Sequence, residues 1–210
     1  MNENIGIHLN KINTAQHPKK ILDVGCGTRP YEALFFGAQY TGLDVYQSGR
    51  KAQDKIADIY FDGINIPLAD NSFDMVLCTQ VLEHCLEPDS LLKEMCRVLE
   101  PGGVLVLTLP FVWLEHERPY DFRRFSYFGA EQIAKKFELE AESISRLTCG
   151  KEALIALIDS IGRRSINGKF DHFIFRLCMK NVRVCLKYLT RKLNPELFYL
   201  NTIAVLRKKV

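Results

Sequence analysis

The stretch Ile21-Leu22-Asp23-Val24-Gly25-Cys26-Gly27-Thr28 decides the fold. A short apolar run leads into a pair of glycines, whose missing side chains let the backbone turn tightly and approach a ligand closely. We expect a buried strand to end here. A ligand would then lie beyond the carboxyl end of that strand, where open parallel sheets bind their ligands.

A second apolar run, YTGLD at 40–44, ends in an acidic residue nineteen positions after Gly25. A carboxylate at Asp44 can accept hydrogen bonds from both ribose hydroxyls of an adenosine ligand. Dinucleotide enzymes and adenosylmethionine enzymes share this arrangement. Pro30 stands where the dinucleotide pattern has its third glycine, after Arg29, and removes an N–H that a pyrophosphate would use. An NAD-dependent oxidoreductase is therefore disfavoured.

Short apolar runs alternate with helical patterns from residue 21 to about 146. The runs are ILDVG (21–25), YTGLD (40–44), FDMVLC (73–78) and GVLVLTL (103–109). Such continuous runs are typical of parallel strands covered on both faces. In the clearest helical segment, Asp89 or Ser90 is expected to cap a helix that ends before Pro101. The alternation predicts a doubly wound α/β sheet.

The pattern changes after Gly150. Residues 151–162 and 169–193 have helical spacing, and residues 197–209 can form a last strand. We therefore predict one domain over 1–210. Its core covers about 18–146 and is closed by the strand at 197–209, with a helical insertion at about 151–193.

Composition narrows the class of protein. A chain of 210 residues with 47% hydrophobic and 25% charged residues is an ordinary globular domain. It has no apolar stretch of bilayer or signal-peptide length, which predicts a cytoplasmic protein. The seven cysteines are scattered, with no C-x-x-C pair, so we expect reduced thiols and no metal site.

The motifs ILDVGCG, YTGLDV, FDGINIPLADNSFDMVLCTQVLEH and LLKEMCRVLEPGGVLVLTLP occur in this order. In order and spacing the chain resembles the class I S-adenosylmethionine-dependent methyltransferases of the type 11 group, over about residues 18–146. The resemblance implies a Rossmann-like methyltransferase fold, with a seven-stranded, mostly parallel sheet in the order 3-2-1-4-5-7-6 and strand 7 antiparallel. It also implies S-adenosylmethionine as the cofactor.

The resemblance implies cofactor contacts along four strand ends. By it, Asp23, Gly25, Cys26 and Gly27 surround the methionine part, Asp44 holds the ribose and Val45 lies against the adenine. Asp62 and Gly63 occupy the adenine edge, and Thr79 and Gln80 lie beside the methionine part. A carboxylate that accepts from the exocyclic amine and a glycine with an open backbone N–H suit an adenine edge.

The acceptor side is expected in residues 111–125, a loop after the fourth apolar run. It resembles a pattern, H-x-x-P-x-D-[YF]-x-R, of methyltransferases found among cell-surface glycan biosynthesis proteins. His116 would then be a general base and Asp121 its orienting carboxylate. Arg123, Arg124 and Trp113 would bind the acceptor. Alternatively, Asp121 and Arg123 only hold the loop, and His84 is a hydrogen-bonding residue at a helix entry.

Charge is unevenly distributed. Residues 1–150 carry 15 Lys and Arg against 21 Asp and Glu, whereas residues 151–210 carry 13 against 4. The basic helix expected at 169–193 is either a solvated helix that packs on the core or a peripheral contact with an anionic inner membrane surface. Its aromatic residues fall at core spacing, so nucleic acid is not expected as a partner. The sequence carries no signal for an oligomeric state.

These observations favour O-methylation of a glycan, a lipid-linked glycan or another small-molecule acceptor. Methyl transfer from a sulfonium is an in-line displacement, so alignment and desolvation can supply much of the rate without a covalent nucleophile. Two alternatives remain open. One is methylation of a quinone-like or other lipophilic acceptor, and the other is a non-catalytic S-adenosylmethionine-binding module.

Overall fold

The computed structural model describes residues 2–51, 53, 55–189 and 194–210. Its seven strands form one sheet in the order β3-β2-β1-β4-β5-β7-β6. The strands are β1 (Lys20–Val24), β2 (Gln39–Val45), β3 (Ile59–Phe61), β4 (Phe73–Thr79), β5 (Leu99–Pro110), β6 (Leu139–Cys149) and β7 (Tyr199–Lys208). β7 runs antiparallel to both of its neighbours. The predicted fold class, strand order and antiparallel strand are confirmed.

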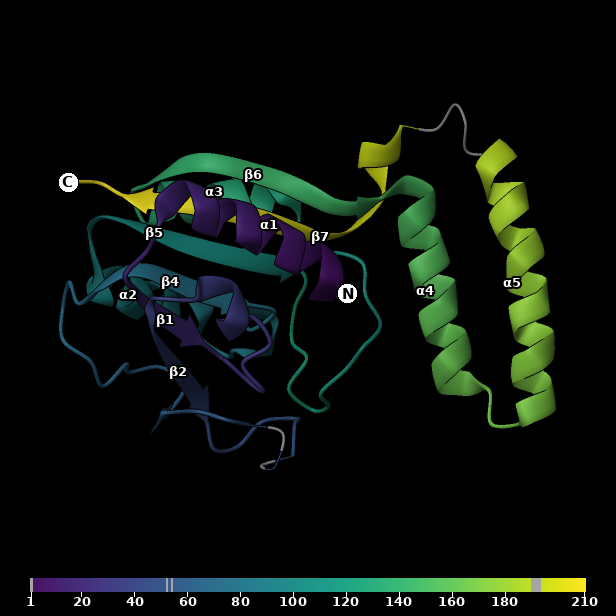
Figure 1. The fold of residues 1–210 in the computed structure, drawn as a ribbon, viewed down its shortest axis with the longest axis horizontal. Coiled ribbons are helices and arrows are strands. Elements are labelled where there is room, and N and C mark those ends of the chain that lie inside the picture. The colour runs from purple at the N-terminus through teal and green to yellow at the C-terminus, as the bar shows by residue number, and fades with distance from the viewer. Residues whose placement is uncertain (1, 52, 54, 190–193) are drawn as a thin grey trace.

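Helices cover both faces of the sheet (Figure 1). On one face lie α2 (Pro88–Val98) and α3 (Tyr127–Lys136), whose apolar side chains pack on the central strands. The other face is covered by α1 (Asn2–Gln16) and the 3-10 helix η1 (Glu32–Phe35). Because both faces are covered, the strands read as continuous apolar runs rather than as alternating ones.

Two local expectations were wrong. α2 begins at Pro88, whose fixed φ suits a first helical position. Neither Asp89 nor Ser90 is its cap, and the Ser90 hydroxyl instead donates to the Glu87 carboxylate at 3.2 Å. β5 begins at Leu99, directly after the helix and four residues before the predicted start at Gly103.

A helical hairpin, α4 (Gly150–Ser165) and α5 (Lys169–Leu189), lies between β6 and β7 in the chain and projects from one end of the sheet (Figure 1). Gly162 lets the two helices approach closely, because a Cβ there would lie 2.1 Å from the ring of Phe175. Met179, one turn further on, is also buried. Residues 190–193 of the predicted second helix lie outside the described residues.

No helix in the described part of the chain is both long and apolar enough to cross a bilayer. The short 3-10 helices η3 (Leu82–His84) and η4 (Pro195–Leu197) complete the fold. η3 follows β4 directly, so its side chains lie at the carboxyl edge of the sheet. That edge is where the chain's ligand site is expected.

Candidate functional site

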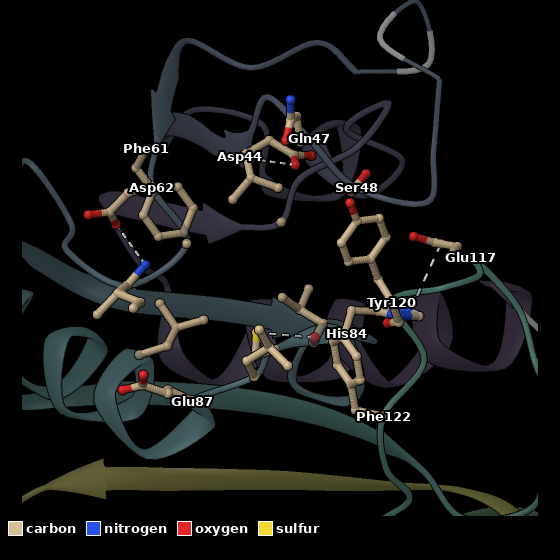
Figure 2. A pocket seen from close by; sticks show the side chains of 18 of the residues that line it. Asp44, Gln47, Ser48, Phe61, Asp62, His84, Glu87, Glu117, Tyr120 and Phe122 are labelled. Carbon is tan, nitrogen blue, oxygen red and sulfur yellow. Dashed lines mark hydrogen bonds and ion pairs between the residues drawn. The ribbon is translucent and has the colours of Figure 1, made fainter.

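A cavity of about 280 Å³ opens at the carboxyl edge of the sheet, between the ends of β1, β2 and β4. The order β3-β2-β1-β4 reverses direction between β1 and β4, and open α/β sheets bind ligands at such a point. Figure 2 shows Asp44, Phe61 and Asp62 on one side of this cavity, with His84, Glu117 and Tyr120 on another. The strand ends and the loop after β5 therefore share one cavity.

The glycine turn after β1 lies against this cavity. Gly25 has a φ of +74°, and a Cβ there would lie 2.4 Å from a methyl group of Val81. Both features require glycine. The N–H groups of Gly25 and Cys26 donate to the carbonyl of Leu43, and the N–H of Arg29 donates to the carbonyl of Cys26. These N–H groups are therefore already hydrogen-bonded within the protein.

Asp44 connects the two strand ends. Its carboxylate accepts from the N–H of Gly27 at 2.9 Å and from the N–H of Val45 at 2.7 Å. The ammonium group of Lys55 lies 3.7 Å from the same carboxylate. Asp44 is buried and on the cavity wall, so it is fixed in position with one side toward the cavity.

Asp23 is buried behind the glycine turn and off the cavity wall. The Tyr40 hydroxyl donates to its Oδ2 at 2.6 Å, while its Oδ1 has no hydrogen-bond partner among the described residues. Burial raises the pKa of Asp23 to about 6, although the hydrogen bond from Tyr40 opposes this effect.

Asp62 and Gly63 lie on the wall beyond the end of β3. The Asp62 carboxylate accepts from the N–H groups of Ile64 and Asn65 and from the side-chain amide of Asn65. These bonds lower its pKa, with the side chain of Asn65 as the largest cause. Gly63 has a φ of +92°. The turn thus holds an exposed acceptor at a fixed place.

The structure brings six of the ten predicted cofactor residues to the cavity wall: Gly25, Asp44, Val45, Asp62, Gly63 and Gln80. Asp23, Cys26, Gly27 and Thr79 lie behind that wall. Burial raises the pKa of the Cys26 thiol to about 12, so this thiol stays neutral. Sequence reasoning missed Gln47, Ser48 and Arg50, which follow β2 and carry no recognisable motif.

The loop after β5 is bound to the turn after β4. The N–H of Phe122 donates to the carbonyl of Glu83 at 2.9 Å. Arg123 donates to the carbonyls of Cys85 and Leu86. Arg124 forms a two-pronged ion pair with Asp121. Both arginines thus hold this loop in place, and neither lies on the cavity wall.

Asp121 is central to the loop. Its side chain is only 2% exposed, and Arg124 holds its pKa well below the usual range. Its Oδ2 accepts from the N–H of His116 and lies 3.3 Å from Nδ1 of the same residue. Burial lowers the pKa of His116, with His84 as the next cause. Trp113 contributes its carbonyl to Arg124.

Three residues beside the cavity were not predicted to act together. Glu83 is fully buried with both carboxylate oxygens unpartnered among the described residues, and burial raises its pKa to about 8. His84 lies on the wall, with Nε2 3.9 Å from Glu83 and 4.0 Å from Glu117. The rings of His84 and His116 meet edge to face, with centroids 4.7 Å apart.

Glu117 joins the two sides of the cavity. The guanidinium of Arg50, from the loop after β2, donates to the Glu117 carboxylate at 2.6 Å. At the same place the backbone of Glu117 lies so close to Gly49 that a Cβ there would overlap it. The cofactor-side and acceptor-side loops are thus in direct contact.

Comparisons with known proteins agree with this geometry. Residues 22–107 match a family model described as a methyltransferase domain. An uncharacterized methyltransferase of Mycobacteroides abscessus is 34% identical over 128 residues, or 56% of this chain and 49% of that protein. Norajmaline N-methyltransferase of Rauvolfia serpentina is 32% identical over 106 residues, or 44% of this chain and 36% of that protein. The chain spans about half or less of the length of these relatives.

Solved structures show the same fold. The YcgJ protein of Bacillus subtilis superposes with a TM-score of 0.61 at 15% identity, covering all of both chains. A phosphoethanolamine N-methyltransferase of Haemonchus contortus, solved with S-adenosylhomocysteine, gives 0.61 at 19% identity over 99% of this chain and 53% of that one. At these identities the match shows the architecture alone.

Proposed function

We propose that this chain, whose residues 22–107 match a methyltransferase domain model, transfers the methyl group of S-adenosylmethionine to an oxygen of a glycan or other small-molecule acceptor. The observation that carries the proposal is the cavity between Gly25 and Asp44, at the switch point of the sheet. It offers a ribose acceptor in Asp44 and an adenine edge at Asp62 and Gly63.

The glycine turn supports a sulfonium ligand over a dinucleotide. Its N–H groups already donate to Leu43, to Asp44 and within the turn itself, so they are not presented to a pyrophosphate. Only the short 3-10 helix Glu32–Phe35 follows the turn, and it supplies no long helix N-terminus for phosphate binding. An adenosine joined to a charged sulfur needs neither feature.

In the proposed reaction, the acceptor oxygen attacks the methyl carbon in line with the sulfur. The carbon–oxygen bond forms as the carbon–sulfur bond breaks, and the sulfur keeps the electron pair to become the neutral thioether of S-adenosylhomocysteine. The acceptor proton leaves to a base or to water. We assign the acceptor to the side of the cavity lined by His84, Glu117, Tyr120 and Phe122.

His116 with Asp121 is our proposed base if no cation is present. Asp121 lies beside Nδ1 of His116, which leaves Nε2 to accept a proton. The lowered pKa of His116 keeps the ring neutral at physiological pH. A general base of this kind accelerates transfer to a hydroxyl by roughly 10²–10⁴-fold.

A lipophilic, quinone-like acceptor is a second candidate. The cavity also has an apolar lining of Phe61, Leu86, Leu91 and Phe122. Of these, Leu86 is 73% exposed, so an apolar acceptor would cover surface that now faces water.

The cofactor assignment is tested by thermal unfolding with S-adenosylmethionine, S-adenosylhomocysteine and NAD. We expect the first two ligands to raise the melting temperature and NAD to leave it unchanged. Ligand at 100 times its Kd stabilises by about 2.7 kcal/mol, which is readily measured. Stabilisation by NAD alone would overturn the proposal. Transfer of labelled methyl groups to pools of sugar nucleotides, lipid-linked glycans or quinones would then identify the acceptor class.

We further propose that the helical hairpin contacts an anionic membrane. α5 carries an exposed apolar stripe on the side opposite Phe175 and Met179, at spacings of three, four and seven residues. The stripe consists of Phe170, Phe173, Ile174, Leu177 and Val184. Lys169, Arg176, Lys180 and Arg183 follow one flank, and Asp171 is the only acidic residue of the helix. This charge complements anionic lipid headgroups.

The double variant Phe173→Ser/Leu177→Ser is expected to weaken binding to phosphatidylglycerol-containing vesicles by at least about 100-fold, since each buried large apolar side chain contributes roughly 1.5–3 kcal/mol. Vesicle co-sedimentation measures it, and binding should also fall at high salt. Phe36→Ser, at a fully exposed position away from the hairpin, is the matched control. Equal binding to neutral phosphatidylcholine vesicles, or no loss in the double variant, would contradict the membrane contact.

A further inference from the structure

Glu83, His84 and His116 form a cluster that the sequence did not predict. One potential ligand atom from each lies within 4.8 Å of those from the other two. The first two residues come from η3, directly after β4, and the third comes from the loop after β5. Two separate segments at the carboxyl edge of the sheet thus bring three donors to one point.

The hydrogen bonds around the two histidines fix which ring nitrogen is available. Nδ1 of His84 lies 2.6 Å from the carbonyl of Tyr120, which has no proton to give, so Nδ1 carries the hydrogen. Nε2 then has a lone pair, and it has no hydrogen-bond partner among the described residues. Metal-binding histidines typically donate their second N–H to a carbonyl or a carboxylate in this way.

His116 repeats the arrangement. Its Nδ1 lies 3.2 Å from the carbonyl of Leu114 and 3.3 Å from the Asp121 carboxylate, both of them acceptors. Nε2 is again the nitrogen left for a ligand. Because Arg124 holds Asp121 from its other side, the orientation of the His116 ring is fixed by a second layer of bonds.

Glu83 supplies the anionic donor. Its side chain has no exposed surface, and neither carboxylate oxygen has a hydrogen-bond partner in the described part of the chain. A buried polar group without a partner is costly, and a bound cation would satisfy it. Two imidazoles and one carboxylate are a donor set that suits Zn²⁺, Mn²⁺ or Co²⁺ rather than Mg²⁺.

We propose that Glu83, His84 and His116 bind one divalent transition-metal ion at the acceptor end of the cavity. Three protein ligands leave coordination positions open, and His84 lies on the cavity wall. If the proposed methyl transfer holds, the ion coordinates the acceptor oxygen there and acts as a Lewis acid that favours loss of its proton. The ion then takes over the task otherwise assigned to His116 as a base.

The test is a titration of metal-free protein with Co²⁺, followed by its visible absorption spectrum. A Cys178→Ser/Cys185→Ser background removes the two exposed thiols, which would otherwise bind added metal. We expect one Co²⁺ per chain, with no thiolate charge-transfer band. Glu83→Gln, His84→Ala and His116→Ala should each weaken binding at least 100-fold. Asp121→Asn keeps all three ligands but weakens the support of His116 and the pair with Arg124, and it should weaken Co²⁺ binding by 10–100-fold.

His172→Asn on α5 is the matched control and should bind Co²⁺ like the parent. Circular dichroism and the S-adenosylmethionine thermal shift establish that each variant folds. Absence of stoichiometric binding, or equal binding in all variants, would overturn the site. Catechol, a chelating diol, should change the Co²⁺ spectrum, and an unchanged spectrum would refute the open position. The Co²⁺ titration needs no methyl donor, so failure of the S-adenosylmethionine assay would refute the proposed function without affecting this result.

Discussion

Asp44→Ala is expected to weaken S-adenosylmethionine binding by roughly 10²–10⁴-fold. The expectation follows from two hydrogen bonds between the carboxylate and the ribose hydroxyls, each to a charged acceptor and each contributing about 1.5–3 kcal/mol. The same carboxylate holds the N–H of Gly27, so its removal also loosens the glycine turn. Isothermal titration calorimetry measures the affinity, and thermal unfolding should show no stabilisation by the cofactor.

Asp89→Asn is the matched control for this prediction. Asp89 is an exposed acidic residue at the start of α2 that pairs with Lys136, and neither residue lines the cavity. This variant should bind the cofactor like the parent protein. Asp44→Asn keeps an oxygen acceptor and should show an intermediate loss. If Asp44→Ala bound S-adenosylmethionine within about threefold of the parent, the ribose contact would be ruled out.

Asp23→Asn is expected to remove a pH-dependent penalty on stability. The pKa of Asp23 rises from 3.8 to about 6 on folding, because burial disfavours the charged carboxylate. Below pH 4 both folded and unfolded states are protonated, and the group has no effect. Between pH 4 and 6 the folded state holds more protons than the unfolded state, so the free energy of unfolding falls as pH rises. Above pH 6 the penalty is complete.

The rise in the pKa of Asp23 from 3.8 to about 6 lowers the free energy of unfolding at neutral pH by at most about 3 kcal/mol. We therefore expect the free energy of unfolding of Asp23→Asn, measured relative to the parent by urea unfolding, to increase by up to that amount from pH 4 to pH 7. The buried amide adds a cost that is independent of pH and does not affect this comparison. Parallel pH profiles for the two proteins would show that the pKa of Asp23 is the same in the folded and unfolded states, and would contradict the raised pKa.

The same carboxylate gives a further readout for the cofactor. Oδ1 of Asp23 has no partner among the described residues, and a positive charge bound on the cavity side of the glycine turn would stabilise the charged form of this carboxylate from across the turn. Saturating S-adenosylmethionine should therefore reduce the pH-dependent loss of unfolding free energy in the parent protein. It should leave the pH dependence of the Asp23→Asn variant unchanged.

The sequence was sufficient to predict the sheet because the central strands are covered on both faces. Their runs of apolar residues stand out from the flanking turns, and the glycine turn marks where the first strand ends. The helix α1 was not predicted, because its sequence is mostly polar and, of the side chains that the structure describes in it, only Ile5 and Leu9 are fully buried. Its formation depends on packing against the sheet, which local spacing does not reveal.

The site was predictable only where it lies on strand ends. Asp44 ends a buried run and Asp62 lies in a motif of the resembled family, whereas Glu117 meets Arg50 across 67 positions of the sequence. Nothing local signals that contact. Glu83 was overlooked for a related reason. A glutamate beside a histidine is typical of a surface turn, and the loop after β5, which packs on Glu83, is distant in the sequence.

The ends of the helical hairpin meet at a single point of the sheet, where the N–H of Gly150 donates to the carbonyl of Phe198 at 2.7 Å. The chain therefore leaves the sheet and returns to it at the same place, and the hairpin is an insertion between two adjacent strands. We expect that a shorter, longer or differently charged insertion can replace the helical hairpin while the register of β6 with β7 is kept. The surface to which the hairpin binds can thus change in evolution without changes to the cavity at the edge of the sheet.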